Sequence, residues 1–166
     1  MKEKEFKDQV ISMSERLYPM VSRMLQNEEG TKDAIQEVMI KLWDRRKQIE
    51  NHPNVPGLVF LTARNYCLDQ IKKKSLHIDS SSSKVLQVHS SNHDPLEYQE
   101  LHSIIENLIK ELPEQQSEIL TLRDLDGLEY AEIAGITDLK VEHIRVLVSR
   151  SRKIIAEKLK NIYSYE

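Results

Sequence analysis

The serine-rich segment from Ser75 to Pro95 most constrains what this chain can fold into. It contains seven serines, four of them consecutive from Ser80 to Ser83, and no Phe, Tyr or Trp. Such a segment has few apolar groups to offset the entropy lost on ordering, and a structureless loop of this length is uncommon inside one compact domain. We therefore expect two modules, 1–74 and 96–166, joined by a flexible linker at 75–95. The alternative is a long surface loop within a single domain.

Apolar residues recur at helical spacing in both modules. The N-terminal pattern predicts helices over about 6–24, 31–49 and 58–74, and the C-terminal pattern predicts them over about 101–111, 114–125, 130–134 and from 141 onward. The chain has only 4 Gly and 5 Pro in 166 residues, which argues against a many-stranded sandwich or barrel. No segment of six or more residues alternates cleanly between polar and apolar side chains. The predicted fold class is all-α.

Local signals set the expected helix boundaries in the N-terminal module. Thr31 is a residue type that caps helices, and Asp33 would then lie in the first turn, near the positive end of the helix dipole. Two prolines predict an irregular loop over 51–57. Pro19 falls inside the first predicted helix, where proline predicts a kink.

The pattern from Gly127 to Lys153 predicts a helix-turn-helix, with a short helix, a turn at 137–138 and a longer second helix. One side of the second helix is expected to be buried and carries Ile144, Leu147, Val148, Ser151 and Ile155. The opposite side carries Glu142, Arg145, Val146, Ser149, Arg150 and Lys153. Arginine binds guanine edges and phosphates, so this face is typical of a DNA-recognition helix. The alternative is an ordinary amphipathic helix with a solvated basic face.

The distribution of charge changes what the net charge of −3 implies. Residues 1–74 carry 14 basic and 11 acidic side chains, and 141–166 carry 6 and 3, so each segment has a charge of +3. Between them, 75–95 has a charge of −1 and 96–140 a charge of −8. Two basic segments around an acidic one are compatible with a chain that binds phosphate at two places.

Several classes of protein are not expected. No stretch approaches the roughly 18 apolar residues of a membrane span, and the start MKEKEFKDQV lacks the apolar core of a signal peptide. The single cysteine, Cys67, suits a reducing cytoplasm, and we expect a packed side chain rather than a redox switch. His89, His93 and His102 have no fixed cysteine or acidic partner, so no metal site is expected. No catalytic or phosphate-loop motif occurs, which predicts a protein that is not an enzyme and has no cofactor.

Both modules carry motifs that occur in order along the chain. In the C-terminal module, Leu112-Pro113, the stretch LEYAEIA at 128–134 and IRVLVSRSRK at 144–153 resemble region four of sigma factors of the extracytoplasmic-function (ECF) class. In the N-terminal module, DAIQEV at 33–38 with Leu42-Trp43 resembles the core of region two. So does the helix that carries Ala63-Arg64-Asn65, Leu68-Asp69 and Lys72-Lys73. The resemblance covers nearly the whole chain in the family's order.

The resemblance implies a factor that binds core RNA polymerase, recognises the minus-ten and minus-thirty-five promoter elements and initiates transcription of a specific gene set. Region two would dock on the clamp coiled coil and melt the minus-ten element. Region four would bind the flap of the β subunit and recognise the minus-thirty-five element. An anti-sigma factor would hold the protein inactive. The alternatives are a stand-alone helix-turn-helix regulator that binds a duplex operator and, more distantly, a helical adaptor that binds only protein.

The resemblance also implies site residues. Gln36 and Glu37 match polymerase-binding positions. Asn65 matches the pocket for an extruded minus-ten base, which the 51–57 loop would complete. Lys72 and Lys73, with Lys74, would bind the single-strand backbone or, alternatively, complement the dipole at a helix end. The positions that match minus-thirty-five contacts are Arg145, Val146, Ser149, Arg150, Arg152 and Lys153.

Four positions depart from the family pattern. Leu58 stands where the family often has Trp. Asp138 replaces the usual glycine of the turn, and aspartate tolerates the left-handed conformation better than most residues. Lys140 stands where Ser or Thr usually caps the recognition helix, so we expect that cap to be missing. Val146 replaces a small polar residue and would favour contact with a thymine methyl group.

Overall fold

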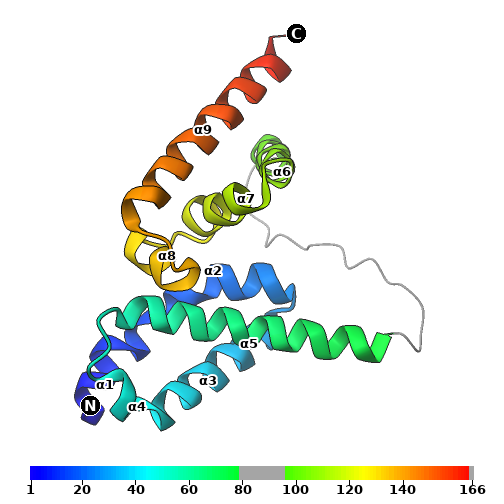
Figure 1. Ribbon diagram of the computed structural model, residues 1–166. Coiled ribbons are helices and arrows are strands. Elements are labelled where there is room, and N and C mark those ends of the chain that lie inside the picture. The colour runs from blue at the N-terminus through cyan, green and yellow to red at the C-terminus, as the bar shows by residue number, and fades with distance from the viewer. Residues whose placement is uncertain (79–95, 165–166) are drawn as a thin grey trace. The chain divides into compact units, whose positions relative to one another are not determined.

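The computed structural model describes residues 1–78 and 96–164, and every regular element within these ranges is helical (Figure 1). The all-α prediction is therefore confirmed. The chain divides into two compact units, with α1 to α5 in the N-terminal one and α6, α7, η2, the start of α8 and α9 in the C-terminal one. From position 79 onward, the predicted linker lies outside the described residues. None of the described helices is long and apolar enough to cross a membrane.

In the N-terminal unit, residues 1–78 form six elements. They are α1 (Glu3–Gln9), the 3₁₀ turn η1 (Ile11–Met13), α2 (Ser14–Leu25), α3 (Glu28–Asp44), α4 (Arg46–Ile49) and α5 (Val55–Ile78). The core lies where α2, α3 and α5 pack against one another. Its buried side chains include Leu17, Met20, Val21, Ala34, Val38, Leu42, Val59, Phe60 and Cys67.

The first predicted helix is interrupted. It breaks at Val10 into α1, η1 and α2, although Phe6, Val10 and Met13 are buried as their spacing predicts. The helix α2 runs through Pro19 to Leu25.

The predicted cap of the second helix was wrong. Asn27 is the N-cap of α3, and its Oδ1 accepts a hydrogen bond from the Gly30 amide at 2.8 Å. Thr31 lies inside the helix, where its side chain is buried and donates to the Asn27 carbonyl at 2.7 Å. Asparagine and threonine are both favourable N-caps. The earlier start places Thr31 on the buried stripe with Ala34 and Val38.

The predicted loop over 51–57 is shorter than expected, because α5 begins at Val55 and includes Pro56 and Gly57. Proline is tolerated in the first turn of a helix, since amides there have no intrahelical acceptor. The Asn54 side chain accepts from the Gly57 amide at 2.9 Å, which satisfies one of those amides. At its other end, α5 continues four residues beyond Lys74.

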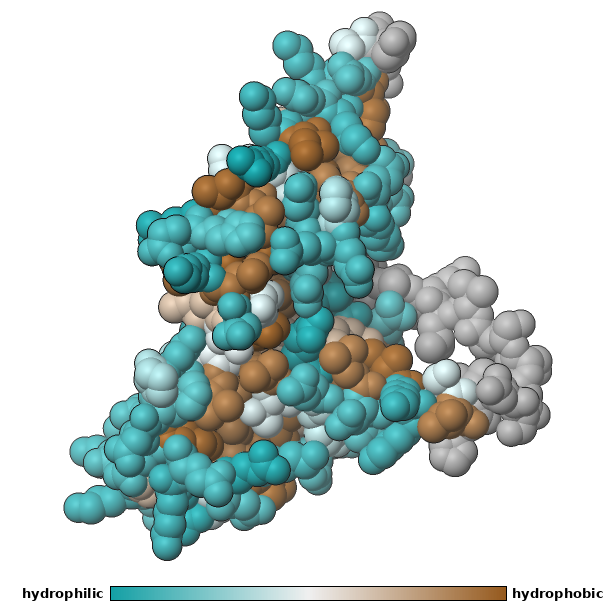
Figure 2. All heavy atoms as spheres, in the orientation of Figure 1, coloured by the Kyte–Doolittle hydropathy of each residue, from teal (hydrophilic) through white to brown (hydrophobic). Residues whose placement is uncertain are grey.

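Residues 96–164 form α6 (Leu96–Lys110), α7 (Glu114–Leu120), the π-helical turn η2 (Thr121–Leu125), α8 (Tyr130–Thr137) and α9 (Val141–Tyr163). The last three helices begin where predicted, whereas α6 begins at Leu96 rather than near 101. The π-turn is closed by a hydrogen bond of 3.0 Å from the Asp126 amide to the Thr121 carbonyl. The core of the C-terminal unit lies between α6, α7 and α9. Apolar patches also reach the surface of both units among hydrophilic side chains (Figure 2).

Candidate nucleic-acid interface

The helix α9 separates a buried stripe from an exposed basic face, as its sequence predicts. The buried residues are Ile144, Leu147, Val148, Ser151 and Ile155. The hydroxyl of Ser151 lies 3.3 Å from Oε1 of Gln116 on α7, so this polar side chain has a partner within the core. The residues predicted to contact DNA are all exposed, namely Arg145, Val146, Ser149, Arg150, Arg152 and Lys153. Val146 is an apolar side chain in the middle of this face and is 44% exposed.

The turn before α9 has the expected geometry. Asp138 adopts a φ of +58°, in the left-handed region that aspartate tolerates. Lys140 is the N-cap residue of α9 and makes no side-chain capping hydrogen bond, which confirms the missing cap. The first amides of this 23-residue helix therefore have no side-chain acceptor at that position. Free amides at a helix N-terminus favour nearby anions such as phosphate.

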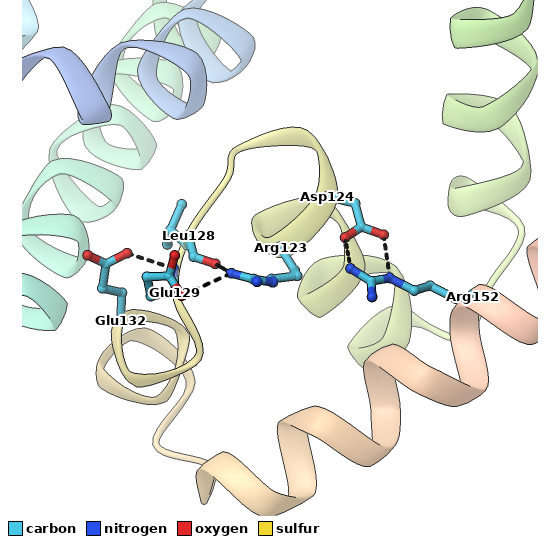
Figure 3. Close-up of polar contacts among 6 residues, drawn as sticks. All are labelled: Arg123, Asp124, Leu128, Glu129, Glu132 and Arg152. Carbon is cyan, nitrogen blue, oxygen red and sulfur yellow. Dashed lines mark hydrogen bonds and ion pairs between the residues drawn. The ribbon is translucent and has the colours of Figure 1, made fainter.

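Arg152 is held by an acidic residue from the preceding segment (Figure 3). Its Nε donates to Oδ2 of Asp124 at 3.0 Å, and its Nη2 donates to Oδ1 at 2.6 Å. This bidentate hydrogen bond raises the pKa of Arg152 above its ordinary value. The side chains remain 52% and 32% exposed, respectively, so the pair contributes at most about 1 kcal/mol to stability. Sequence reasoning missed this contact because the two residues are 28 positions apart with no shared motif.

A second cluster surrounds Tyr130 at the start of α8. The guanidinium carbons of Arg123 and Arg145 lie 4.5 and 5.4 Å from the centroid of its ring. Arg123 also donates from Nη1 to the Leu128 carbonyl at 2.7 Å (Figure 3). The carboxylate of Glu132 accepts from the Glu129 amide at 2.8 Å and so caps the N-terminus of α8. The cluster joins η2, α8 and the exposed face of α9.

In the N-terminal unit, Asn65 lines a cavity of about 400 Å³. The lining comes from α3, α4, α5 and the segment before α5, with Lys41, Leu42, Arg45, Gln48, Ile49, His52, Leu58, Thr62, Asn65, Tyr66 and Asp69. His52 is the residue that the predicted 51–57 loop contributes before α5 begins. Burial raises the pKa of the Tyr66 phenol, which keeps its hydroxyl protonated and able to donate a hydrogen bond. The cavity thus combines an amide, a phenol, a carboxylate and cationic groups.

The lysines predicted to contact the DNA backbone, Lys72 and Lys73, are exposed on α5 outside the lining of this cavity. The helix extends to Ile78, so Lys72, Lys73 and Lys74 all precede its last turn. Because the helix dipole acts mainly within the last turn, a role in complementing it loses support.

The two residues predicted to bind polymerase, Gln36 and Glu37, are exposed on α3, away from its buried stripe. Sequence reasoning missed an apolar groove of about 340 Å³ beside them. Its lining is Glu3, Phe6, Lys7, Ile11, Met39, Ile40 and Trp43. Met39 and Ile40 lie one helical turn from Gln36, on a neighbouring part of the same helix surface. Ile40 is 55% exposed.

Two other predictions concern residues away from these sites. Cys67 is fully buried, which confirms that it packs in the core, and burial raises the pKa of its thiol to about 11. His102 lies on α6 with Nδ1 3.6 Å from the Glu106 carboxylate. His89 and His93 lie outside the described residues. Within 1–78 and 96–164, no group of three or more possible metal-binding side chains comes together.

Comparison with protein families gives two matches along the chain. Residues 11–76 match the family model described as Sigma-70 region 2, and residues 102–155 match the one described as Sigma-70, region 4. The first match contains Asn65 and the cavity it lines, and the second contains the exposed face of α9.

Similar proteins span almost the whole chain. The ECF RNA polymerase sigma-E factors of Escherichia coli K12 and Salmonella typhimurium LT2 are each 28% identical over 168 residues, which is 95% of this chain and 87% of theirs. The protein of the same description from Haemophilus influenzae is 40% identical over 60 residues, covering 36% of this chain and 32% of its own length.

Two solved structures share the fold. One is the sigma factor RpoE of Bartonella quintana in complex with the anti-sigma factor NepR, with a TM-score of 0.63, 22% identity and coverage of 95% of this chain and 98% of that one. The other is CnrH in complex with the cytosolic domain of CnrY, with a TM-score of 0.57, 14% identity and coverage of 96% and 90%.

Proposed function

Because the chain belongs to the ECF class of the sigma-70 family, we propose that it binds core RNA polymerase and directs it to the promoters of a specific gene set, where transcription begins. The observation that carries this proposal is the occurrence of both sigma-70 regions in one chain, in order, over 11–76 and 102–155. In this proposal, 1–74 acts as region two, 96–166 acts as region four, and 75–95 links them. The protein is a specificity subunit in the cytoplasm and performs no catalysis of its own.

Region four recognises the minus-thirty-five element through α9. Arg145, Ser149 and Arg150 contact base edges or phosphates, and Val146 contacts a thymine methyl group. Lys153 and Arg152 add contacts to the DNA backbone. The exposure of all six side chains on α9 supports this assignment.

Region two opens the minus-ten element. Melting costs unstacking energy, which a flipped base in a pocket and a bound single strand can offset. The cavity beside Asn65 has hydrogen-bonding groups of several kinds and a volume suited to a base. Lys72 and Lys73 bind the backbone of the single DNA strand beside this cavity.

Gln36 and Glu37 contact the clamp coiled coil of polymerase, and region four contacts the flap. The apolar groove between α1, η1 and α3 extends the surface by which Gln36 and Glu37 contact the clamp coiled coil. Both solved structures of the same fold are complexes, and one of them is a sigma factor bound to an anti-sigma factor. We propose that an anti-sigma factor likewise binds this chain and blocks its contact with polymerase.

Reconstitution with core RNA polymerase tests the function. The protein should elute with core polymerase in gel filtration and allow it to select specific fragments from genomic DNA. Permanganate footprinting of such a fragment should then reveal unpaired thymines near the transcription start. Binding of a duplex without polymerase, and without unpaired thymines, would instead indicate a stand-alone regulator.

A further inference from the structure

Two arginines on one flank of α9 are held by side chains from the segments before it. Arg145 and Arg152 are seven residues apart, so helical geometry places them within about 20° of the same direction and about 10 Å apart along the axis. Asp124 binds Arg152, and the ring of Tyr130 lies against Arg145. We propose that Asp124 and Tyr130 are positioning residues, which hold these arginines as contacts to DNA phosphates before DNA binds. This inference rests on the proposed function of region four.

The contacts leave each arginine able to bind DNA. A guanidinium group has five N–H donors, and Asp124 occupies one on Nε and one on Nη2 of Arg152. Three donors remain for a phosphate. The Tyr130 ring engages the guanidinium of Arg145 through its face, and the N–H donors of a guanidinium point outward in its plane.

Tyr130 is itself fixed in place. Arg123 lies over the same ring and donates to the Leu128 carbonyl, so its guanidinium is committed to the protein. Nη1 of Arg123 also lies 3.3 Å from Oε2 of Glu129. The capping bond from the Glu129 amide to Glu132 anchors the beginning of α8. The ring therefore presents a fixed surface to Arg145.

Positioning has a direct consequence for affinity. A free arginine loses rotamer freedom when it contacts DNA, and a restrained one loses less, which favours binding by about two- to tenfold for each side chain. The opposite role for Asp124 is that it competes with phosphate for Arg152. The two roles differ in sign, because removing a carboxylate that only competes would strengthen DNA binding.

The test uses holoenzyme reconstituted from the full chain and core RNA polymerase. The probe is a labelled duplex that the wild-type holoenzyme selects from a random-sequence library, and binding is measured by fluorescence anisotropy at several KCl concentrations. Asp124→Ala should weaken binding about two- to tenfold and leave the slope of log K against log salt unchanged, because Arg152 still contacts its phosphate but loses more rotamer freedom on binding. Tighter binding with a steeper slope, or unchanged binding, would overturn the proposal.

Further variants separate positioning from folding. Adding Asp124→Ala to Arg152→Ala should weaken binding no further, because Asp124 acts through that arginine. Tyr130→Phe keeps the ring and should bind like the wild type, whereas Tyr130→Leu should weaken binding about two- to tenfold and have no further effect when Arg145→Ala is already present. Asp124→Asn should also weaken DNA binding, and it replaces Asp124→Ala in the test if the alanine variant folds poorly. Thermal unfolding and elution with core polymerase serve as folding controls for every variant.

Failure of the two proposals can be told apart. A wild-type holoenzyme that selects no fragment contradicts the proposed function. A wild-type holoenzyme that binds its fragment while Asp124→Ala and Tyr130→Leu bind equally well contradicts the positioning roles alone.

Discussion

The ammonium group of Lys41 lies 4.6 Å from the centroid of the Tyr66 ring. This contact joins α3 to α5 at the wall of the cavity that Asn65 lines. An ammonium over a ring contributes about 0.5–1 kcal/mol at an exposed site, so it helps to keep the two helices in register beside the cavity. The protein alone therefore forms this wall of the cavity.

Asn65→Ala should impair promoter opening more than polymerase binding. The substitution removes an amide from the cavity, which would leave an extruded base with fewer hydrogen bonds at a cost of about 1–3 kcal/mol. We expect about a tenfold loss of permanganate-reactive thymines. Elution with core polymerase should be unchanged. Asn161→Ala, which alters an exposed asparagine near the end of α9, is the matched control. Equal opening by both variants would remove Asn65 from the site.

Val146 should make the minus-thirty-five contact sensitive to a single methyl group. Replacing each thymine of the selected fragment by deoxyuridine should weaken wild-type binding at one position by about fourfold, since a buried methyl group contributes about 0.8 kcal/mol. Val146→Ser should bind both versions equally, and Val146→Ile should keep the difference. Wild-type binding that ignores every uracil substitution would contradict a thymine contact.

Cys67 predicts a loss of stability at alkaline pH. Its pKa is raised from the ordinary value of 9.0 to about 11 in the folded chain. The neutral thiol is favoured by folding, so its contribution is complete below the unfolded pKa and is lost as the pH rises toward 11. In urea unfolding from pH 8 to 11, the wild type should lose about 2 kcal/mol more of its free energy of unfolding than Cys67→Val does. Parallel curves would contradict this prediction.

The capping role of Asn27 can be measured directly. Asn27→Ala should lower the free energy of unfolding by about 1 kcal/mol, because the Gly30 amide loses its acceptor. Asn27→Asp retains an acceptor and places a negative charge near the positive end of the helix dipole, so it should match or exceed the wild type. Chemical denaturation of the three proteins provides the comparison. A larger loss for Asn27→Asp than for Asn27→Ala would be inconsistent with the cap.

The sequence predicted the C-terminal unit better than the N-terminal one. Its helix boundaries depend on local signals, such as the proline after Leu112, a glycine at 127 with φ +73° and Asp138 with φ +58°. In the N-terminal unit, Asn27 and Thr31 are both suitable caps. The choice between them depends on the burial of Thr31 against other helices, which local patterns do not encode. Proline breaks a helix in its interior but is tolerated in its first turn, so the position of Pro56 in the sequence does not settle where α5 begins.

The side-chain contacts that organise the site could not be predicted from one sequence. The pair formed by Asp124 and Arg152 joins residues from η2 and α9, and no periodicity relates them. The apolar groove arises where the exposed part of α3 meets α1 and η1, so its residues belong to separate predicted helices. The exposed face of α9 was predictable because one helical period describes it completely.

The π-turn has a consequence for how this chain could change during evolution. A π-turn holds one residue more than an α-turn, so Thr121–Leu125 could lose a single residue and become α-helical while α7 keeps its packing. Each residue rotates a helix by about 100°, so the deletion would turn the carboxylate of Asp124 away from Arg152. A lineage could therefore discard or regain this contact through a one-codon deletion or insertion in η2, which also carries the buried Leu122.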